Sequence, residues 1–233
     1  AHVMATAILR IWPDAQFAYG PPIETGFYYD FDMKHRITPD DFEKIEDEMK
    51  KIAKENQKFE YKAISREDAR AMAESGRLLA SVFGQLDRLS LIGMSTLQVD
   101  EMVERFIVDD LQSRPASKGQ YGYGFVLNSS VNDVVCHGVP SQSDVLRDGD
   151  IVNFDITLEK NGFIADSSKT YLVGEVDPVA RRLVQTTYEA MWKGIRAVRP
   201  GARLGDIGWA IERHAKRNGY SVVREYCGHG IGR

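Results

Sequence analysis

A β-hairpin is the most strongly specified element of this 233-residue sequence. The stretch "DIVNFDITLEKNGFIADSSKTYLVG" (150–174) places Asn161-Gly162 between two runs that are rich in β-branched and aromatic residues. Asn-Gly between such runs is the strongest short-range signal for a hairpin. A two-residue turn at this point predicts that Lys160 faces Phe163 and that Thr157 faces Asp166.

The predicted register brings two carboxylates together. Asp155 and Asp166 share one face of the hairpin and lie diagonal to each other, within reach of one metal ion. A slip of one residue would send them to opposite faces, so the hypothesis depends on the register. Their neighbours are largely apolar, and two carboxylates in such surroundings need a cation or hydrogen-bond donors. The alternative is that both aspartates face water or cap local donors.

A weak internal repeat is present. The stretches "GMSTLQVDEMVERFI" (93–107) and "GARLGDIGWAIERHA" (201–215) align without gaps, with three identities. A β-rich stretch ending in His-Gly follows each of them, "VVCHGVP" (134–140) and "YCGHGIG" (226–232). We interpret this pattern as a duplicated helix-then-strand unit.

The repeat gives His137 and His229 matched positions. Two such histidines and a carboxylate pair indicate a divalent metal such as Mn²⁺, Fe²⁺ or Co²⁺. Cys136 is next to His137, but neighbours on a strand point to opposite faces, which argues against an activated thiol. We expect Cys136 and Cys227 to be small buried side chains. The remaining candidates, His35 and His214, are expected at the surface.

The first part of the chain differs in style from the rest. It predicts a helix ending near Trp12-Pro13, a strand over 27–31, and a helix that begins after Thr38-Pro39. That helix carries an apolar face of Phe42, Ile45, Met49 and Ile52. The style changes around 62–72, and helices are then predicted near 70–90, 96–112, 178–197 and 205–218.

Composition excludes several classes of protein. Residues 1–69 hold 10 Lys/Arg and 14 Asp/Glu, a charge of −4, and residues 70–233 hold 20 of each. Neither part is a basic body, although a small RNA-binding patch stays open. The absence of a run of about eighteen apolar residues argues against a membrane span, and we find no secretory signal pattern. We expect a reduced, cytoplasmic protein.

From about residue 70 to Arg233 the chain resembles the type I methionine aminopeptidases. The stretches that carry this likeness include "RPASKGQYGYGF", "NSSVNDVVCHGVP", "RPGARLGDIG", "NGYSVVREYCGHGIGR" and the hairpin. The resemblance implies an α+β, pita-bread fold (creatinase/aminopeptidase-like) with a pseudo-twofold repeat. It also implies that Asp155, Asp166 and His229 are metal ligands and that His137 contacts the substrate. Tyr123 falls where the family lines its methionine pocket, although "YGYG" departs from the usual proline-containing loop.

The same resemblance implies a cofactor and a substrate. The family holds up to two divalent ions (Co, Mn, Fe or Zn) that share a water, and it releases methionine from the N-terminus of nascent peptides. It also uses two glutamate ligands and a further histidine beyond the point that matches Arg233. We therefore expect a fold and a metal site that are incomplete at the C-terminus, with low activity and self-association through exposed core surface.

Residues 1–69 resemble the editing domain of threonyl-tRNA synthetase. The likeness lies in "AHVMATAILRIWPDAQFAYGPPIETGFYYDFDM" and "TPDDFEKIEDEMKKIAKEN". His2 fits the second histidine of that family's first His-x-x-x-His motif. The resulting expectation is two pieces, 1–69 and 70–233, with tRNA or the ribosome as an alternative partner. A chimera without selected function is the other alternative.

Overall fold

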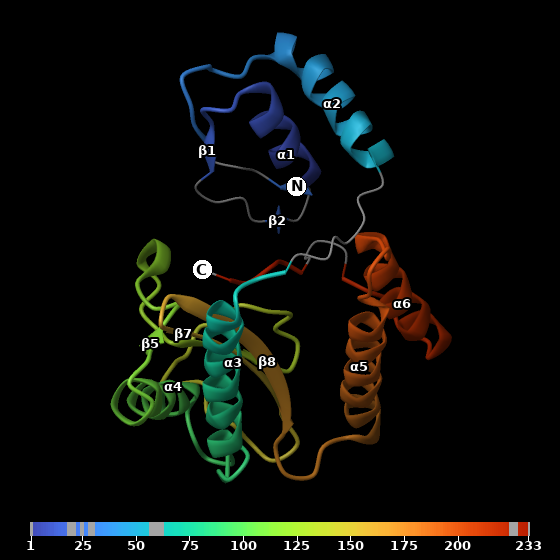
Figure 1. The fold of residues 1–233 in the computed structure, drawn as a ribbon. Helices are drawn as coiled ribbons and strands as arrows, with labels where there is room; N and C mark the ends of the chain where they lie inside the picture. Colours follow the sequence, from blue (N-terminus) through green and yellow to red (C-terminus); the bar gives the residue numbers. More distant parts are fainter. Residues whose placement is uncertain are drawn as a thin grey trace. The chain divides into compact units, whose positions relative to one another are not determined.

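The computed structural model describes residues 2–17, 22–23, 26–27, 31–55, 63–223 and 228–232. The chain forms two compact units (Figure 1). One unit contains Ala1–Tyr61 and Tyr188–Gly228, and the other contains Lys62–Thr187 and His229–Arg233. The expected division of the chain into 1–69 and 70–233 stays a prediction.

A four-stranded antiparallel sheet forms the centre of the second unit. Strand β7 (Ile151–Lys160) pairs along its whole length with β8 (Phe163–Leu172). On its other edge β7 pairs with β6 (Leu127–Val131) and with the short β5 (Arg114–Pro115). The predicted hairpin is confirmed, and β7 is its central strand.

One face of this sheet is covered by helix α3 (Arg66–Leu86). Side chains of α3 and the inward residues of β7 form a core whose members are almost fully buried, including Leu79, Val82, Val152, Phe154, Ile156 and Leu158. The helix begins earlier than predicted, because Ser65 caps it by accepting a hydrogen bond from Asp68 N (2.9 Å). Ser75 Oγ of α3 donates to Phe163 O (3.0 Å), which ties the helix to the hairpin turn.

The two repeats have the same local structure. Gly93 and Gly201 adopt positive φ values of 84° and 82°, and a helix begins three residues after each. At the two caps, Ser95 N donates to the Gln98 side chain and Arg203 N donates to the Asp206 side chain, both at 2.8 Å. These helices are α4 (Thr96–Arg105), extended by a π-helical turn over Phe106–Asp110, and α6 (Leu204–Arg217). The duplication that three identities predicted is thus confirmed in the helices.

Helix α5 (Pro178–Ala197) precedes the second repeat. It begins at Pro178, as predicted, because proline is favoured in the first turn of a helix. Helix α6 ends where Asn218 is followed by Gly219, whose φ of 85° suits a residue without a Cβ atom. His214 of α6 is not the surface residue that we expected, since its side chain is 14% exposed and lies 3.1 Å from Glu189.

The first unit begins with α1 (His2–Ile11), which ends just before Trp12-Pro13 as predicted. A 3₁₀ turn over Pro39–Asp41 leads into α2 (Phe42–Glu55), and α1 and α2 pack together. Ile45 and Ile52 are buried in that contact, but Phe42 is 56% exposed, so its assignment to the inner face was wrong. The helix is nevertheless amphipathic in the predicted sense.

Short strands lie between α1 and α2. Strand β1 (Gln16–Phe17) pairs with β4 (Phe31–Asp32), and β2 (Pro22–Ile23) pairs with β3 (Gly26–Phe27). The strand predicted over 27–31 can be compared only at its two ends, because residues 28–30 lie outside the described part. In the described residues, no helix has both the length and the apolar character that a membrane crossing requires.

Candidate metal centre

The hairpin places Asp155 and Asp166 on one face, as its sequence predicts. Lys160 pairs with Phe163 and Thr157 pairs with Asp166, which is the predicted register. The turn residues Asn161 and Gly162 both have positive φ, at 55° and 78°. Because side chains alternate along a strand, burying the apolar residues of β7 against α3 turns the two aspartates to the opposite face. The register therefore follows from the turn and from the core together.

His229 reaches the same face from the far end of the chain. Its Nε2 atom lies 3.4 Å from Asp166 Oδ2, and Nδ1 lies 2.9 Å from Gly230 O. Ile164 N of β8 donates to Gly232 O (2.7 Å), so the segment 228–232 lies along β8. The histidine is held beside the hairpin by this backbone contact, and its ring stays largely exposed.

The electrostatics of the pair fit a missing cation. Burial raises the pKa of Asp166, the negative charge of Asp155 raises it further, and His229 lowers it. Two neighbouring carboxylates with raised proton affinity are expected where positive charge is lacking. Oxygen ligands with an imidazole suit Mn²⁺, Fe²⁺, Co²⁺ or Zn²⁺, so the donor set fits the expected metal.

The three candidate ligands do not form a closed triad. Asp166 is close to Asp155 and to His229. Within the described residues, no group of three or more His, Cys, Asp or Glu side chains is arranged to hold a metal ion. The exposed ring of His229 is also engaged with its own segment through Gly230 O. A ligand role for all three residues is therefore a proposal.

Tyr123 lies close to the carboxylates. Its hydroxyl donates to Leu127 O (2.7 Å), and its ring meets Phe125 edge to face at 5.6 Å. Burial raises the pKa of Tyr123 to about 12, with smaller contributions from the charges of Asp100 and Asp155. The phenol thus stays protonated near neutrality and presents an uncharged ring near the site.

His137 sits in an unusual backbone conformation next to β6. Its φ is 58°, and the next residue, Gly138, is held by Ser129 N donating to Gly138 O (2.7 Å). A Cβ atom on Gly138 would lie 2.0 Å from Ser129 O, so the loop approaches the strand as closely as glycine permits. The contact fixes His137 beside the sheet that carries Asp155, and its side chain is exposed.

Some site residues were missed by sequence reasoning. A hollow around Asp166 and His229 is also lined by Ser117, Gln120 and Thr157. The hydroxyl oxygen of Thr157 is buried and has no hydrogen-bond partner among the described residues. The register placed Thr157 opposite Asp166, but only burial shows that its hydroxyl lacks a partner.

Asp100 of α4 was also missed. It is buried, and its Oδ1 atom accepts hydrogen bonds from Val126 N (2.9 Å) and Leu127 N (3.1 Å). Burial raises the pKa of Asp100, and these two amide donors partly oppose the shift. Asp100 thereby fixes the start of β6, whose backbone accepts from Tyr123. A buried acid on an amphipathic helix could have drawn attention in the sequence.

The cysteines take no part in this arrangement. Cys136 is a half-buried free thiol rather than the fully buried side chain that we expected. Cys227 lies outside the described residues. Of the other candidates, His2 is the first residue of α1. His35 lies 2.9 Å from Asp41 and stacks on Trp12, with a side chain that is 41% exposed, as expected of a surface residue.

Comparison with known proteins gives matches over the second part of the chain. The model of metallopeptidase family M24 matches residues 70–233. Methionine aminopeptidase of Escherichia coli K12 is 42% identical over 167 residues, which are 72% of this chain and 63% of that protein. The chain thus spans less than two thirds of the length of this curated relative.

Solved structures agree with the sequence matches. Methionine aminopeptidase from Rickettsia prowazekii superimposes with a TM-score of 0.71 and 40% identity, over 74% of this chain and 69% of that one. A prolidase from Thermococcus sibiricus has a TM-score of 0.55 and 19% identity over 67% and 41%, a likeness of fold alone. The pita-bread fold is confirmed.

The resemblance of residues 1–69 to a synthetase editing domain has no support in these comparisons. The family match starts at residue 70, close to the change of style in the sequence. It includes the hairpin, both repeats and every candidate ligand. The chain belongs to metallopeptidase family M24.

Proposed function

We propose that this chain is a methionine aminopeptidase-type metallopeptidase that acts on peptides with an N-terminal methionine. The observation that supports this most directly is the approach of His229 to Asp166 on the face that also carries Asp155. A pair of aspartates on adjacent strands and a histidine from the second repeat are the ligand types that the family resemblance implies. The cytoplasm is the proposed compartment, on the same resemblance.

Asp155, Asp166 and His229 would hold a divalent ion in this proposal. A metal bound there would lower the pKa of a water molecule and polarise the peptide carbonyl. The identity of the metal (Co, Mn, Fe or Zn) and the binding of a second ion belong to the proposal as well.

Other residues would bind and orient the peptide. The ring of Tyr123 is uncharged and packs against Phe125, so it can line a pocket for an apolar methionine side chain. We assign His137 to the substrate rather than to the metal, because its exposed ring projects from a loop that its glycine neighbour fixes beside β6. A hydrogen bond from its imidazole to the peptide would orient the scissile carbonyl.

We expect little activity from the 233-residue polypeptide. The resemblance implies two glutamate ligands in addition to the three residues named above. Loss of residues that only support metal ligands commonly costs ~10–100-fold in metal affinity or activity. The loss of direct ligands should cost more.

Calorimetric titration with Mn²⁺ and an assay of methionine release from Met-Ala peptides test the proposal. Binding should be present in the parent chain and absent in Asp166→Ala, whereas Asp109→Asn, an exposed acid on the π-helical turn, should bind as the parent does. Mn²⁺ binding that Asp166→Ala leaves unchanged would overturn the ligand assignment. Rapid methionine release that Asp166→Ala abolishes would overturn the expectation of low activity.

Two further hypotheses remain from the sequence. Residues 1–69 are proposed, on resemblance, as a synthetase editing-domain remnant that binds tRNA, and the packed pair α1 and α2 gives them a core. tRNA binding that survives removal of residues 70–233 and weakens with salt would support this idea. Exposed apolar side chains of α5, such as Met191 and Ile195, are proposed to drive self-association, which sedimentation measures.

A further inference from the structure

Helices α5 and α6 pack against each other through their apolar sides. Gly194 of α5 lies so close to α6 that a Cβ atom there would be 2.9 Å from Ile211 and 3.2 Å from Ile207. His214 Nε2 of α6 lies 3.1 Å from Glu189 Oε2 of α5, a second link between the helices. The isoleucines of α6 thus face α5, which leaves the other side of α6 to the solvent.

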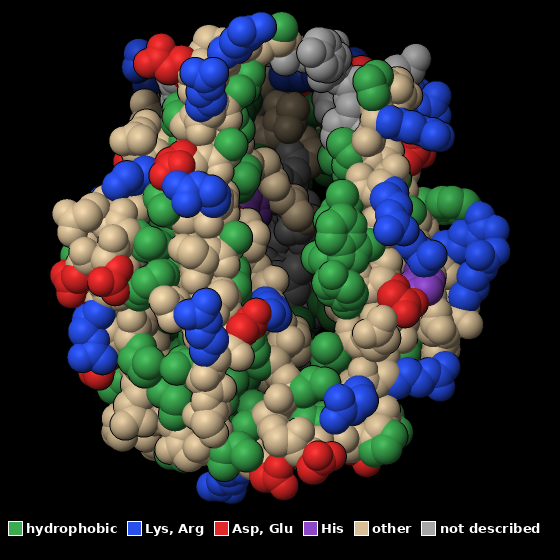
Figure 2. All heavy atoms as spheres, turned by 60° about the horizontal axis from the view of Figure 1, so that its bottom comes forward, with side chains coloured by type: hydrophobic (Ala, Val, Ile, Leu, Met, Phe, Trp, Pro, Cys, Tyr) green, Lys and Arg blue, Asp and Glu red, His purple; other side chains and the backbone are tan. Residues whose placement is uncertain are grey.

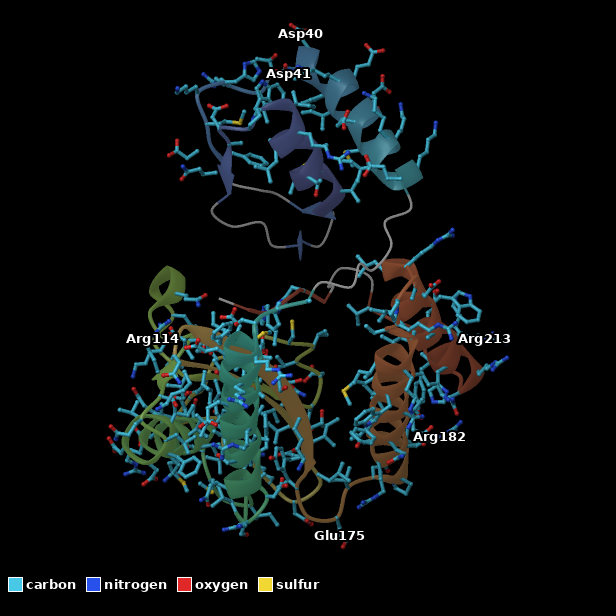
Figure 3. All side chains as sticks on the ribbon, in the orientation of Figure 1. Asp40, Asp41, Arg114, Glu175, Arg182 and Arg213 are labelled. Carbon is cyan, nitrogen blue, oxygen red and sulfur yellow. The ribbon has the colours of Figure 1, made fainter. Side chains whose placement is uncertain are left out.

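The exposed side of this helix pair is basic. Residues 188–217 contain seven Lys/Arg and three Asp/Glu, a net charge of +4 in a chain whose total is −4. All seven basic side chains are exposed. Figure 2 shows Lys and Arg side chains gathered over these helices, and Figure 3 shows Arg213 projecting from α6 away from α5. This surface, which we call the basic face, consists of Lys193, Arg196, Arg199, Arg203, Arg213, Lys216 and Arg217.

The few acids nearby neutralise little of this charge. Glu189 is engaged with His214, and Glu212 pairs with Lys216 at 2.8 Å. Asp206 accepts from the backbone N–H of Arg203 rather than from its guanidinium. In the described part of the chain, Lys193, Arg203 and Arg217 form no ion pair. Most of the positive charge is therefore available to an anionic partner.

Each helix also presents an exposed tryptophan beneath an arginine. The guanidinium of Arg196 lies 6.0 Å from the ring centre of Trp192, and that of Arg213 lies 4.6 Å from the ring centre of Trp209. The sequences "WKGIR" (192–196) and "WAIER" (209–213) repeat the spacing Trp-x-x-x-Arg, which places the two side chains on one face of a helix. Trp209 is 59% exposed, an unusual cost for a large ring unless something covers it.

Helix electrostatics account for only part of this pattern. Lys216 and Arg217 sit in the last turn of α6, where cations interact favourably with the helix dipole. That effect falls off within one turn, so it does not explain Arg213 or Arg196. It gives no reason for the exposed indole rings either. A ligand that offers both negative charge and flat apolar surface explains all of these features together.

We propose that the basic face of α5 and α6 binds single-stranded RNA. The Lys and Arg side chains would contact phosphates, and unpaired bases would stack on Trp209 and Trp192. A membrane surface fits less well, since it requires an apolar side that faces outward, and the isoleucines of α6 face α5. This inference is independent of the proposed peptidase activity and of the hypothesis for residues 1–69.

Fluorescence anisotropy of a labelled twelve-nucleotide oligo(U) with the full chain tests the proposal. The triple variant Arg213→Gln, Lys216→Gln, Arg217→Gln should bind about tenfold or more weakly at low salt. The slope of log K against log salt should fall by about 2, since each phosphate contact on a single strand contributes roughly 0.7. Trp209→Ala should weaken binding about fivefold or more without changing this slope, because stacking is not ionic.

The matched control is the triple variant Lys50→Gln, Lys51→Gln, Lys54→Gln on α2, which removes the same charge from another exposed helix. It should bind as the parent chain does, and circular dichroism should show that all variants are folded. Equal weakening by both triple variants would overturn the proposal by showing that net charge alone matters. An unaffected Trp209→Ala, duplex RNA bound as tightly as the single strand, or stronger binding to anionic vesicles would also overturn it.

Discussion

His229 Nε2 lies 3.4 Å from Asp166 Oδ2, although the two residues belong to different repeats of the chain. The contact depends on the segment 228–232 lying along β8, where Ile164 N donates to Gly232 O. A histidine from the second repeat thereby meets a carboxylate that belongs to the first hairpin. The relationship defines the candidate metal centre.

The charge of Asp166 should lower the stability of the metal-free chain. Because burial and the charge of Asp155 raise the pKa of Asp166, a neutral amide at this position removes repulsion. We expect Asp166→Asn to raise the melting temperature without metal by about 2 °C or more. The same variant should lose the rise that Mn²⁺ produces in the parent chain.

Thermal unfolding with and without Mn²⁺ measures both effects, and Asp109→Asn is the control. The control should show the parent's behaviour in both conditions. A metal-free Asp166→Asn that melts below the parent would contradict the electrostatic account. An undiminished response to Mn²⁺ would contradict the ligand role.

Asp100 and Asp87 should give opposite dependences of stability on pH. Burial raises the pKa of Asp100, so the folded state binds its proton more tightly, and this contribution to stability declines as pH rises above about 4. A hydrogen bond from Lys169 lowers the pKa of Asp87, so that contribution is present above about 4 and is lost as pH falls.

Urea unfolding at pH 4 and pH 7 tests the pair. Asp100→Asn should gain stability relative to the parent on going from pH 4 to pH 7, while keeping an oxygen that accepts from Val126 and Leu127. Asp87→Asn should lose stability relative to the parent over the same interval. Two differences of the same sign would mean that one of the shifts has the wrong direction.

Gly138 should tolerate no side chain. Its Cβ atom would lie 2.0 Å from Ser129 O and 2.7 Å from the carbonyl carbon, and neither backbone atom can move without disturbing β6. We expect Gly138→Ala to lower the free energy of unfolding by about 2 kcal/mol or more, as overpacking does. Gly84→Ala is the matched control, because it meets nothing within 4 Å inside α3 and should gain about 0.5–1 kcal/mol. Urea titration of both variants distinguishes a local clash from a general intolerance of substitution.

The hairpin turn should influence the site through its register. Gly162 has a φ of 78°, a conformation that costs an L-residue about 1–2 kcal/mol. Gly162→Ala should therefore lower the free energy of unfolding by about that amount and weaken Mn²⁺ binding. Asn161→Gly, which also accommodates positive φ, should change both quantities less. Stability loss with unchanged Mn²⁺ affinity would show that the register is held by the core rather than by the turn.

Much of the fold was predictable because its signals are local. Asn161-Gly162 predicted the hairpin, Pro178 and Gly219 predicted helix ends, and the alternation along β7 predicted which side chains are buried. Errors arose where tertiary contacts decide exposure. Phe42 has the correct helical spacing but is exposed, and His214 looks like a surface residue but is largely buried against Glu189.

The sequence by itself determined the register of the hairpin, and with it the shared face of Asp155 and Asp166. Side chains alternate strictly along strands, and the turn fixes which residues pair, so local chemistry suffices. Only the tertiary structure decided that His229 meets Asp166, that Asp100 anchors β6, and that the Thr157 hydroxyl is buried without a partner among the described residues. Those features depend on packing between segments distant in the chain, whose energies are not encoded in local patterns.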